Sequence, residues 1–169
     1  MKRVLVISDT HGRNDDIEGV LAQVGHIDYM IHCGDLERGE EYVRSLVDCP
    51  VTLISGNNDY YLDLPMEAEI EIEGIKIWIT HGHYYYVGMT IDYLREEGLK
   101  KGVDVVMFGH THVPYFEKGD DLIILNPGSL TYPRQPGRKP TFLIMEIDDE
   151  GKPHFGHGYY TQHFDELNI

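Results

Sequence analysis

The first third of the chain alternates strand-like and helix-like segments, and this alternation constrains the fold most strongly. Residues 4–7 are a continuous run of β-branched residues and leucine, which is typical of a strand covered on both faces. Apolar residues then recur at helical spacing over 17–24. The same two patterns continue with a strand at 29–33, a helix over 42–47 and a strand at 51–54. This order predicts parallel strands joined by right-handed helical crossovers.

The pattern changes after residue 68. Glutamate alternates with isoleucine over 69–73, and Gly74 turns the chain into the apolar run 75–80, which predicts a hairpin with one wet face. A helix is expected over 90–100 and a strand over 103–108. Further strands are expected at 115–118, 122–126, 142–147 and 154–160. The chain is therefore predicted to be an α/β protein, a single domain over 1–169. Two stacked mixed sheets flanked by helices would form a four-layer α/β/β/α sandwich.

The charge restricts the partners that the protein can bind. With 29 acidic and 14 basic residues the net charge is −15, which disfavours long nucleic acids because their affinity comes largely from lysine and arginine. The apolar run near the N-terminus is too short for a signal peptide, and no stretch approaches the length of a membrane span. Two cysteines are too few for a disulfide framework. We expect a cytoplasmic protein without membrane partners; assembly into homo-oligomers stays open.

Oxygen and imidazole side chains follow five of the predicted strands. In open α/β sheets ligands bind beyond the carboxyl ends of the strands, and here these ends carry Asp9, His11, Asp35, Asn57, His81, His110 and His112. The last two histidines are one residue apart after a strand, so their side chains can point to the same side. Such ligands suit Mn²⁺, Fe²⁺ or Zn²⁺. Seven exceed the needs of one ion, and two ions about 3.5–4 Å apart with a bridging carboxylate would use them all.

Each of these segments also has an ordinary interpretation. Residues 9–11 could be a helix-capping loop, 34–35 and 56–57 could be common turns, and 81–83 could be an exposed loop. Their coincidence at successive strand ends favours the two-metal interpretation.

The polar segments also resemble a known family. The calcineurin-like metallophosphoesterases have five blocks that are similar to Asp9-x-His11, Gly34-Asp35, Gly56-Asn57-Asn58-Asp59, Thr80-His81-Gly82-His83 and Gly109-His110-Thr111-His112. The short chain, and Leu125-Asn126-Pro127-Gly128-Ser129 followed by Pro133-Arg134, resemble the YfcE-like phosphodiesterase branch. The resemblance extends from the first strand to about Arg134.

The resemblance implies two divalent metal ions. Mn²⁺ is the expected ion, with Ni²⁺, Fe²⁺ or Zn²⁺ as alternatives. One ion would be held by Asp9, His11, Asp35 and His112, and the other by Asp35, Asn57, His81 and His110. Asp35 would then bridge the two. A hydroxide between two cations is a nucleophile near neutral pH, and the cations neutralise the charge of the attacked phosphate.

Four further residues are candidates for catalysis. Many superfamily members have a histidine that protonates the leaving group at the position of Asn58, and asparagine cannot act as a general acid near pH 7. Asp59 is expected to orient His11 or His81. His83 could replace the missing acid, bind phosphate, or be an exposed loop residue. Arg134 could clamp a phosphate, or be an exposed residue of its Pro-Gly-rich loop with no role in binding.

The tyrosine runs 60–61 and 84–86 follow two of the blocks. Packing at the rim of the site is the favoured interpretation, and stacking of a nucleobase or aryl group is the alternative. The last histidines, His154, His157 and His163, are expected at the surface.

These inferences predict a two-metal-dependent phosphodiesterase that hydrolyses small phosphoesters. A phosphomonoesterase or nucleotidase using the same site is the nearest alternative. A non-catalytic metal-binding scaffold, like the retromer subunit of this fold, is the second, although every ligand position is filled here. A nuclease acting on long chains is disfavoured by the charge of −15.

Overall fold

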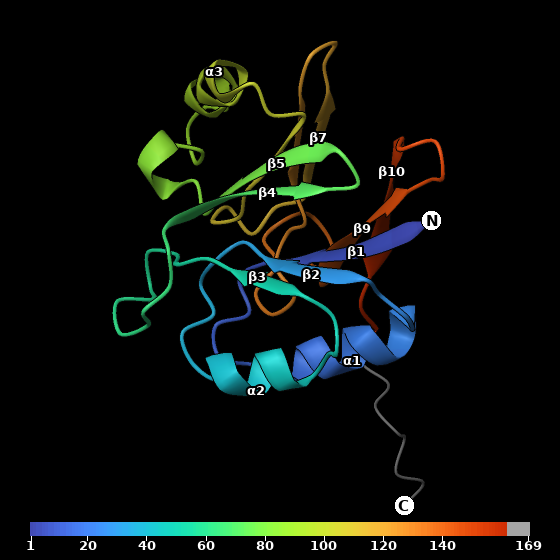
Figure 1. Cartoon of the computed structure of the whole chain (residues 1–169). Coiled ribbons are helices and arrows are strands. Elements are labelled where there is room, and N and C mark those ends of the chain that lie inside the picture. Colours follow the sequence, from blue (N-terminus) through green and yellow to red (C-terminus); the bar gives the residue numbers. More distant parts are fainter. Residues whose placement is uncertain (162–169) are drawn as a thin grey trace, which may run out of the picture.

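The computed structural model describes residues 1–161, and these contain two five-stranded sheets (Figure 1). The first sheet has the order β10-β9-β1-β2-β3, formed by β1 (Lys2–Ile7), β2 (Tyr29–His32), β3 (Val51–Leu53), β9 (Thr141–Ile147) and β10 (Pro153–Tyr159). The second has the order β4-β5-β6-β8-β7, formed by β4 (Glu67–Ile72), β5 (Ile75–Thr80), β6 (Val105–Met107), β7 (Tyr115–Lys118) and β8 (Ile123–Asn126).

Both sheets are mixed. In the first, β1, β2 and β3 run parallel, with α1 (Asp15–Val24) and α2 (Glu40–Ser45) as their crossovers. In the second, β5, β6 and β8 run parallel, and α3 (Asp92–Lys101) connects β5 to β6. The remaining pairs, β1–β9, β9–β10, β4–β5 and β7–β8, are antiparallel. Among the described residues 1–161, no helix combines the length and the apolar character that a membrane span requires.

The two faces of β1 show why its sequence is apolar throughout. Val4 and Val6 point into the core between the sheets, where residues such as Ile79 of the second sheet also lie. Leu5 and Ile7 point the other way, into the core beneath α1 and α2. Helix α3 covers the outer face of the second sheet, against Trp78 and Val106. The predicted α/β/β/α sandwich is therefore confirmed.

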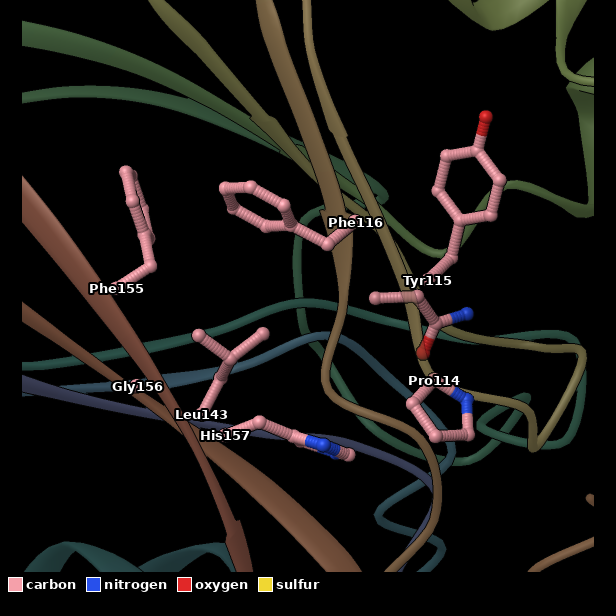
Figure 2. Close-up of a pocket in the computed structure, with 8 residues that line it drawn as sticks. Pro114, Tyr115, Phe116, Leu143, Phe155, Gly156 and His157 are labelled. Atoms are coloured by element: carbon pink, nitrogen blue, oxygen red, sulfur yellow. The ribbon is translucent and has the colours of Figure 1, made fainter.

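A groove of about 500 Å³ separates the sheets where β7 approaches β10. The rings of Phe116 and Phe155 lie 5.3 Å apart at this groove (Figure 2). Pro114, Leu143 and His157 also line it. The clusters of metal-ligand side chains among residues 1–161 lie elsewhere, at the carboxyl ends of the central strands.

Candidate metal centre

The seven predicted ligands come from loops at the ends of five strands. Asp9 and His11 follow β1, Asp35 follows β2, Asn57 follows β3, His81 follows β5, and His110 and His112 follow β6. The structure brings them together although they are separated by up to a hundred residues of sequence. Five of them form two clusters that share Asp9, one with His11 and His112 and the other with Asp35 and His81. Asn57 and His110 lie beside the second cluster.

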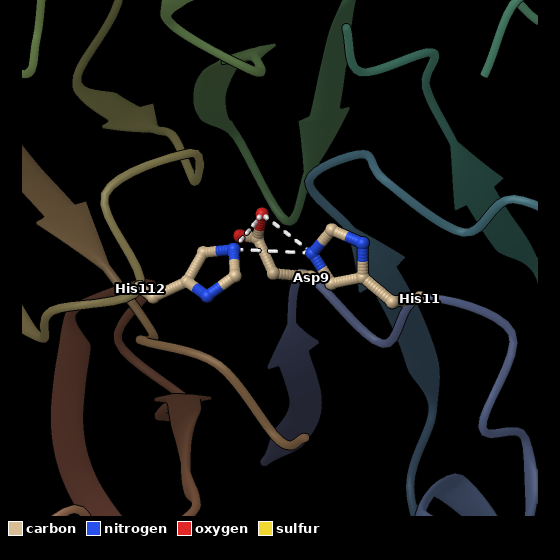
Figure 3. Close-up of side chains that lie close together, drawn as sticks. All are labelled: Asp9, His11 and His112. Carbon is tan, nitrogen blue, oxygen red and sulfur yellow. Dashed lines mark hydrogen bonds and ion pairs between the residues drawn. The ribbon is translucent and has the colours of Figure 1, made fainter. Parts of the chain in front are cut away.

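The first cluster is compact (Figure 3). Nε2 of His112 lies 3.2 Å from Oδ1 of Asp9, and Nε2 of His11 lies 3.9 Å from the same oxygen. The two Nε2 atoms are 3.1 Å apart. A divalent ion about 2.0–2.2 Å from each ligand would hold neighbouring ligand atoms about 3–3.5 Å apart. The two distances to Nε2 of His112 fit a shared cation, and the 3.9 Å between Asp9 and His11 is wider than this range.

The protonation of these imidazoles gives an independent test of that fit. His112 donates from Nδ1 to the carbonyl oxygen of Tyr132 at 2.7 Å, and His11 donates from Nδ1 to Oε1 of Glu37 at 2.7 Å. With the protons on Nδ1, the two neutral imidazoles direct Nε2 lone pairs at each other. Two lone pairs 3.1 Å apart repel unless a positive charge lies between them. This is the arrangement of metal-binding histidines held by outer hydrogen bonds.

The second cluster repeats the arrangement around His81. Its Nδ1 donates to the carbonyl oxygen of Cys33 at 2.7 Å, so Nε2 faces Oδ2 of Asp35 at 3.4 Å and Oδ1 of Asn57 at 3.0 Å. Nδ1 of His110 approaches the same Asn57 oxygen at 3.0 Å. Burial lowers the pKa of His81, but the hydrogen bond with Asp35 and the charge of Asp9 raise it, and the net shift is upward. The surroundings thus favour a positive charge at Nε2, which a divalent ion can supply.

One oxygen of Asp9 is left for such an ion. Its Oδ2 accepts hydrogen bonds from Oγ of Ser8 at 2.6 Å and from the backbone N–H of His110 at 3.1 Å. Its Oδ1 is buried and has no hydrogen-bond partner among the described residues. A buried carboxylate oxygen without a partner is costly, and a metal ion removes that cost. Both clusters therefore suit divalent cations.

The backbone at this centre is strained. Five of the seven predicted ligands have left-handed backbone conformations, namely Asp9 (φ 56°), His11 (φ 47°), Asp35 (φ 58°), His110 (φ 70°) and His112 (φ 58°). Such conformations cost about 1–2 kcal/mol per residue outside glycine and occur where the surroundings impose them, often at functional sites. These left-handed conformations direct successive side chains of the short loops toward the same point.

Two glycines allow the loops to approach. A Cβ atom on Gly56 would lie 2.2 Å from Oδ1 of Asp35, and one on Gly109 would lie 2.1 Å from Oγ of Ser8 and 2.7 Å from Oδ2 of Asp9. Neither position can hold a larger residue without displacing a ligand. Glycine precedes Asn57 and His110 for this steric reason.

The prediction that Asp59 orients His11 or His81 is wrong. The carboxylate of Asp59 instead accepts hydrogen bonds from backbone N–H groups of Asp35, Leu36, Glu37 and Gly56, at 2.6 to 3.3 Å. The imidazoles find other partners, since Glu37 contacts His11 and a carbonyl oxygen contacts His81. Asp59 therefore shapes the loop after β2, and reaches His11 only through Glu37.

His32 supports the centre and was not singled out from the sequence. It is fully buried, accepts a hydrogen bond at Nδ1 from the N–H of Gly34 at 3.2 Å, and donates from Nε2 to Oγ1 of Thr10 at 2.8 Å. Burial is the main cause that lowers the pKa of His32 to about 4. It is therefore a neutral link between the loops after β1 and β2. A histidine within the apolar run 29–33 was the available signal.

The segment 125–129, which contributed to the resemblance, also holds the ligand loops. Asn126 donates from Nδ2 to the carbonyl oxygen of Gly109 at 2.9 Å and to Oγ1 of Thr111 at 3.0 Å. Ser129 donates from Oγ to the carbonyl oxygen of Asp9 at 2.8 Å. These side chains fix the backbone on both sides of the first cluster.

The remaining catalytic candidates lie beside the clusters. Asn58 donates from Nδ2 to Oδ2 of Asp35 at 2.8 Å, so its amide contacts a predicted ligand. His83 is half-buried, with its ring 5.4 Å from that of His81 and 6.0 Å from that of His110. Arg134 is exposed and donates its backbone N–H to the carbonyl oxygen of His112 at 2.9 Å.

Away from the centre, His154 and His157 are exposed, as predicted, and His163 lies outside the described residues.

Comparison with known proteins agrees with this geometry. Residues 1–150 match the model of the calcineurin-like phosphoesterase superfamily domain. The chain belongs to this superfamily. A probable metallophosphoesterase of Methanocaldococcus jannaschii is 40% identical over 151 residues, which are 87% of this chain and 78% of the relative. The predicted superfamily is therefore confirmed.

Two other similarities bear on activity and fold. A phosphodiesterase of Methanocaldococcus jannaschii is 30% identical over 145 residues, covering 75% of this chain and 82% of the relative. The crystal structure of a predicted phosphoesterase from Streptococcus pneumoniae superposes with a TM-score of 0.77 at 26% identity, covering 94% of this chain and 97% of the other.

Proposed function

We propose that this metallophosphoesterase is a two-metal phosphodiesterase acting on small phosphoesters in the cytoplasm, with Mn²⁺ as the working ion. The observation that carries the proposal is the pair of Asp/His clusters sharing Asp9. Two ions bound there would supply a nucleophile from water near neutral pH and neutralise the charge of the attacked phosphate. The 30% identical phosphodiesterase supports diesters as the substrate class.

The ligand assignment is the one expected from the resemblance, in which Asp35 is shared, whereas the two clusters share Asp9. Asp9, His11, Asp35 and His112 would hold one ion, and Asp35, Asn57, His81 and His110 the other. Oδ2 of Asp35 supports the bridging role, because it lies 3.8 Å from Nε2 of His11 and 3.4 Å from Nε2 of His81. Asn58 would keep this carboxylate in place through its amide.

The residues at the margin would bind the substrate. Arg134 donates its backbone N–H to the loop of His112 and its side chain is exposed. Its guanidinium would clamp a phosphate oxygen. His83 packs on two predicted ligands and is the remaining imidazole available to contact the phosphate or the leaving group. The net charge of −15 disfavours long polyanions, so the substrate is small.

The test compares a diester with a monoester. Metal-stripped protein is titrated with Mn²⁺ and assayed with bis-p-nitrophenyl phosphate and p-nitrophenyl phosphate. We expect Mn²⁺-dependent diester cleavage that disappears in His110→Ala and persists in His154→Ala, whose side chain is exposed on β10. Faster cleavage of the monoester would favour the phosphomonoesterase.

Metal binding without turnover by Mn²⁺, Ni²⁺, Fe²⁺ or Zn²⁺ would overturn the proposal and favour a scaffold. Binding would be measured by calorimetry on the same samples. The two variants report whether any activity belongs to this centre, because only His110 lies in it.

A further inference from the structure

Exposed tyrosines border the metal centre. Tyr85 packs inward, with its ring 5.2 Å from that of Trp78 and its hydroxyl donating to Glu67 at 2.8 Å. Its neighbour Tyr84 is 66% exposed, and Tyr132 is 52% exposed. Within the run 84–86, Tyr85 is thus packed, whereas the ring of Tyr84 is largely in contact with solvent. Tyr132, which lies outside the tyrosine runs, is a further exposed ring. Exposed aromatic rings beside a candidate metal centre are available to contact a bound substrate.

Each of the two exposed rings lies beside a different histidine. The ring of Tyr84 is 4.2 Å from that of His83, which in turn lies beside His81 of the second cluster and His110. The ring of Tyr132 is 5.5 Å from that of His11, which belongs to the first cluster. A tyrosine thus flanks each cluster.

This arrangement matches the shape of a phosphodiester. The phosphate would lie over the two clusters, and its two ester groups would project in different directions, one toward the tyrosine beside each cluster. A monoester has only one such group and would leave one tyrosine unused. Aromatic side chains stack on planar groups with little dependence on their identity.

We propose that Tyr84 and Tyr132 are stacking platforms for the two ester groups of a small phosphodiester carrying planar aromatic groups, such as a short nucleoside diester. This inference rests on the proposed phosphodiesterase function and names its substrate class. The charge of −15 limits the substrate to short molecules.

The experiment uses diesters that share one leaving group. Methyl, phenyl and thymidine-5′ esters of p-nitrophenyl phosphate all react by attack of water on phosphorus and loss of p-nitrophenolate. The same bond breaks in each, so differences in kcat/KM report the group that is retained. We expect kcat/KM to be about tenfold higher for the phenyl and thymidine esters than for the methyl ester.

The two tyrosines should respond differently. Tyr84→Ala and Tyr132→Ala each remove one platform. The variant that loses the platform for the retained group should show a preference for aromatic over methyl esters that is about tenfold smaller. The variant that loses the platform for the leaving group should show a lower kcat/KM for all three esters, because all three have the same aromatic leaving group. The corresponding Tyr→Phe variants keep the ring and should behave like the wild type.

Tyr159→Ala is the matched control, because Tyr159 is also 52% exposed but lies on β10, with its ring beside His157 and Lys139. It should not alter the preference. Equal kcat/KM for the methyl and aromatic esters, or no response to either alanine variant, would overturn the inference while leaving the phosphodiesterase function intact.

A second measurement separates this inference from the proposed function. If none of the esters is hydrolysed, the proposed phosphodiesterase function is wrong. Calorimetry of the Mn²⁺-loaded protein then tests the stacking platforms on their own. Thymidylyl-thymidine should bind at least about tenfold more tightly than dimethyl phosphate, and Tyr84→Ala should reduce the difference. Equal binding of the two diesters would overturn the platforms.

Discussion

Glu37 fixes His11: its Oε1 atom accepts the Nδ1 proton of the imidazole at 2.7 Å. The backbone N–H of Glu37 in turn donates to Oδ1 of Asp59 at 2.6 Å, and Glu37 itself has a left-handed backbone (φ 67°). The carboxylate of Asp59 therefore acts on the first cluster through the loop after β2. Nε2 of His11 is left facing the cluster.

Glu37→Ala should weaken metal binding at the first cluster about 10- to 100-fold, because the imidazole loses the partner that sets its tautomer and orientation. Calorimetric titration of the metal-stripped protein with Mn²⁺ measures this. Glu37→Gln keeps an oxygen acceptor and should lose less. Glu41→Ala, an exposed site on α2 with the same change in charge, is the control. An equal loss in Glu37→Ala and Glu41→Ala would show that only net charge matters.

Gly56→Ala should disturb the metal centre, because the new methyl group would meet Asp35 at its side chain and its backbone nitrogen. We expect the free energy of unfolding to fall by about 1–3 kcal/mol and metal affinity to fall with it. Urea unfolding and metal titration measure the two effects. Gly156→Ala, where a Cβ meets nothing within 4 Å, is the control. Unchanged affinity in Gly56→Ala would mean that the two loops can move apart freely.

His32 should make the metal-free protein less stable in acid. The folded state keeps this imidazole neutral with a pKa of about 4, whereas the unfolded chain takes up a proton below the ordinary value of 6.5. The unfolded state therefore binds more protons between these values, and the contribution of His32 to stability is lost as pH falls from about 6.5 to 4. A shift of this size corresponds to about 3 kcal/mol.

The measurement is urea unfolding between pH 7 and 4 for the wild type and His32→Gln, whose amide can still donate to Thr10. The variant should be less stable at pH 7, and the gap should shrink by up to about 3 kcal/mol at pH 4. A gap that stays constant over this range would show that His32 does not titrate as its burial requires.

Asn58→His should raise monoester hydrolysis relative to diester hydrolysis, because an imidazole can protonate a poor leaving group and an amide cannot. The ratio of kcat/KM for the two p-nitrophenyl substrates and for alkyl phosphates measures this. The substitution also removes the donor to Oδ2 of Asp35, so metal occupancy must be determined in the same samples. No gain in the ratio at full occupancy would show that leaving-group protonation does not limit the reaction.

The sandwich was predictable because the pattern of each element is local. The run 4–7 is apolar throughout because one face of β1 packs in the core between the sheets and the other in the core beneath the helices. The alternation of glutamate with isoleucine in β4 follows from its place at the edge of the second sheet. Helix boundaries were less accurate: α2 covers Glu40–Ser45, whereas the apolar spacing indicated 42–47. Tertiary packing decides such ends, and local spacing does not.

The grouping of the seven predicted ligand residues was also predictable, because parallel strands place their carboxyl ends at one edge. The hydrogen bonds that support them were not. Asp59 contacts backbone N–H groups of Asp35 to Glu37, more than twenty residues away, and His32 meets Thr10 of another loop. Such partners depend on how the loops cross, which no sequence spacing encodes.

Hydrogen bonds within the protein hold the loops of this centre. Ser129 and Asn126 donate to backbone carbonyl oxygens of the loops, and Asp59 accepts from a backbone N–H of another loop. These hydrogen bonds hold the backbone of the loops without the help of an ion. Oxygen and imidazole ligands bind first-row divalent ions in an order that is set by the metal more than by the protein. The supply of metal in the surroundings, together with the ligand geometry, would then select which ion the centre carries.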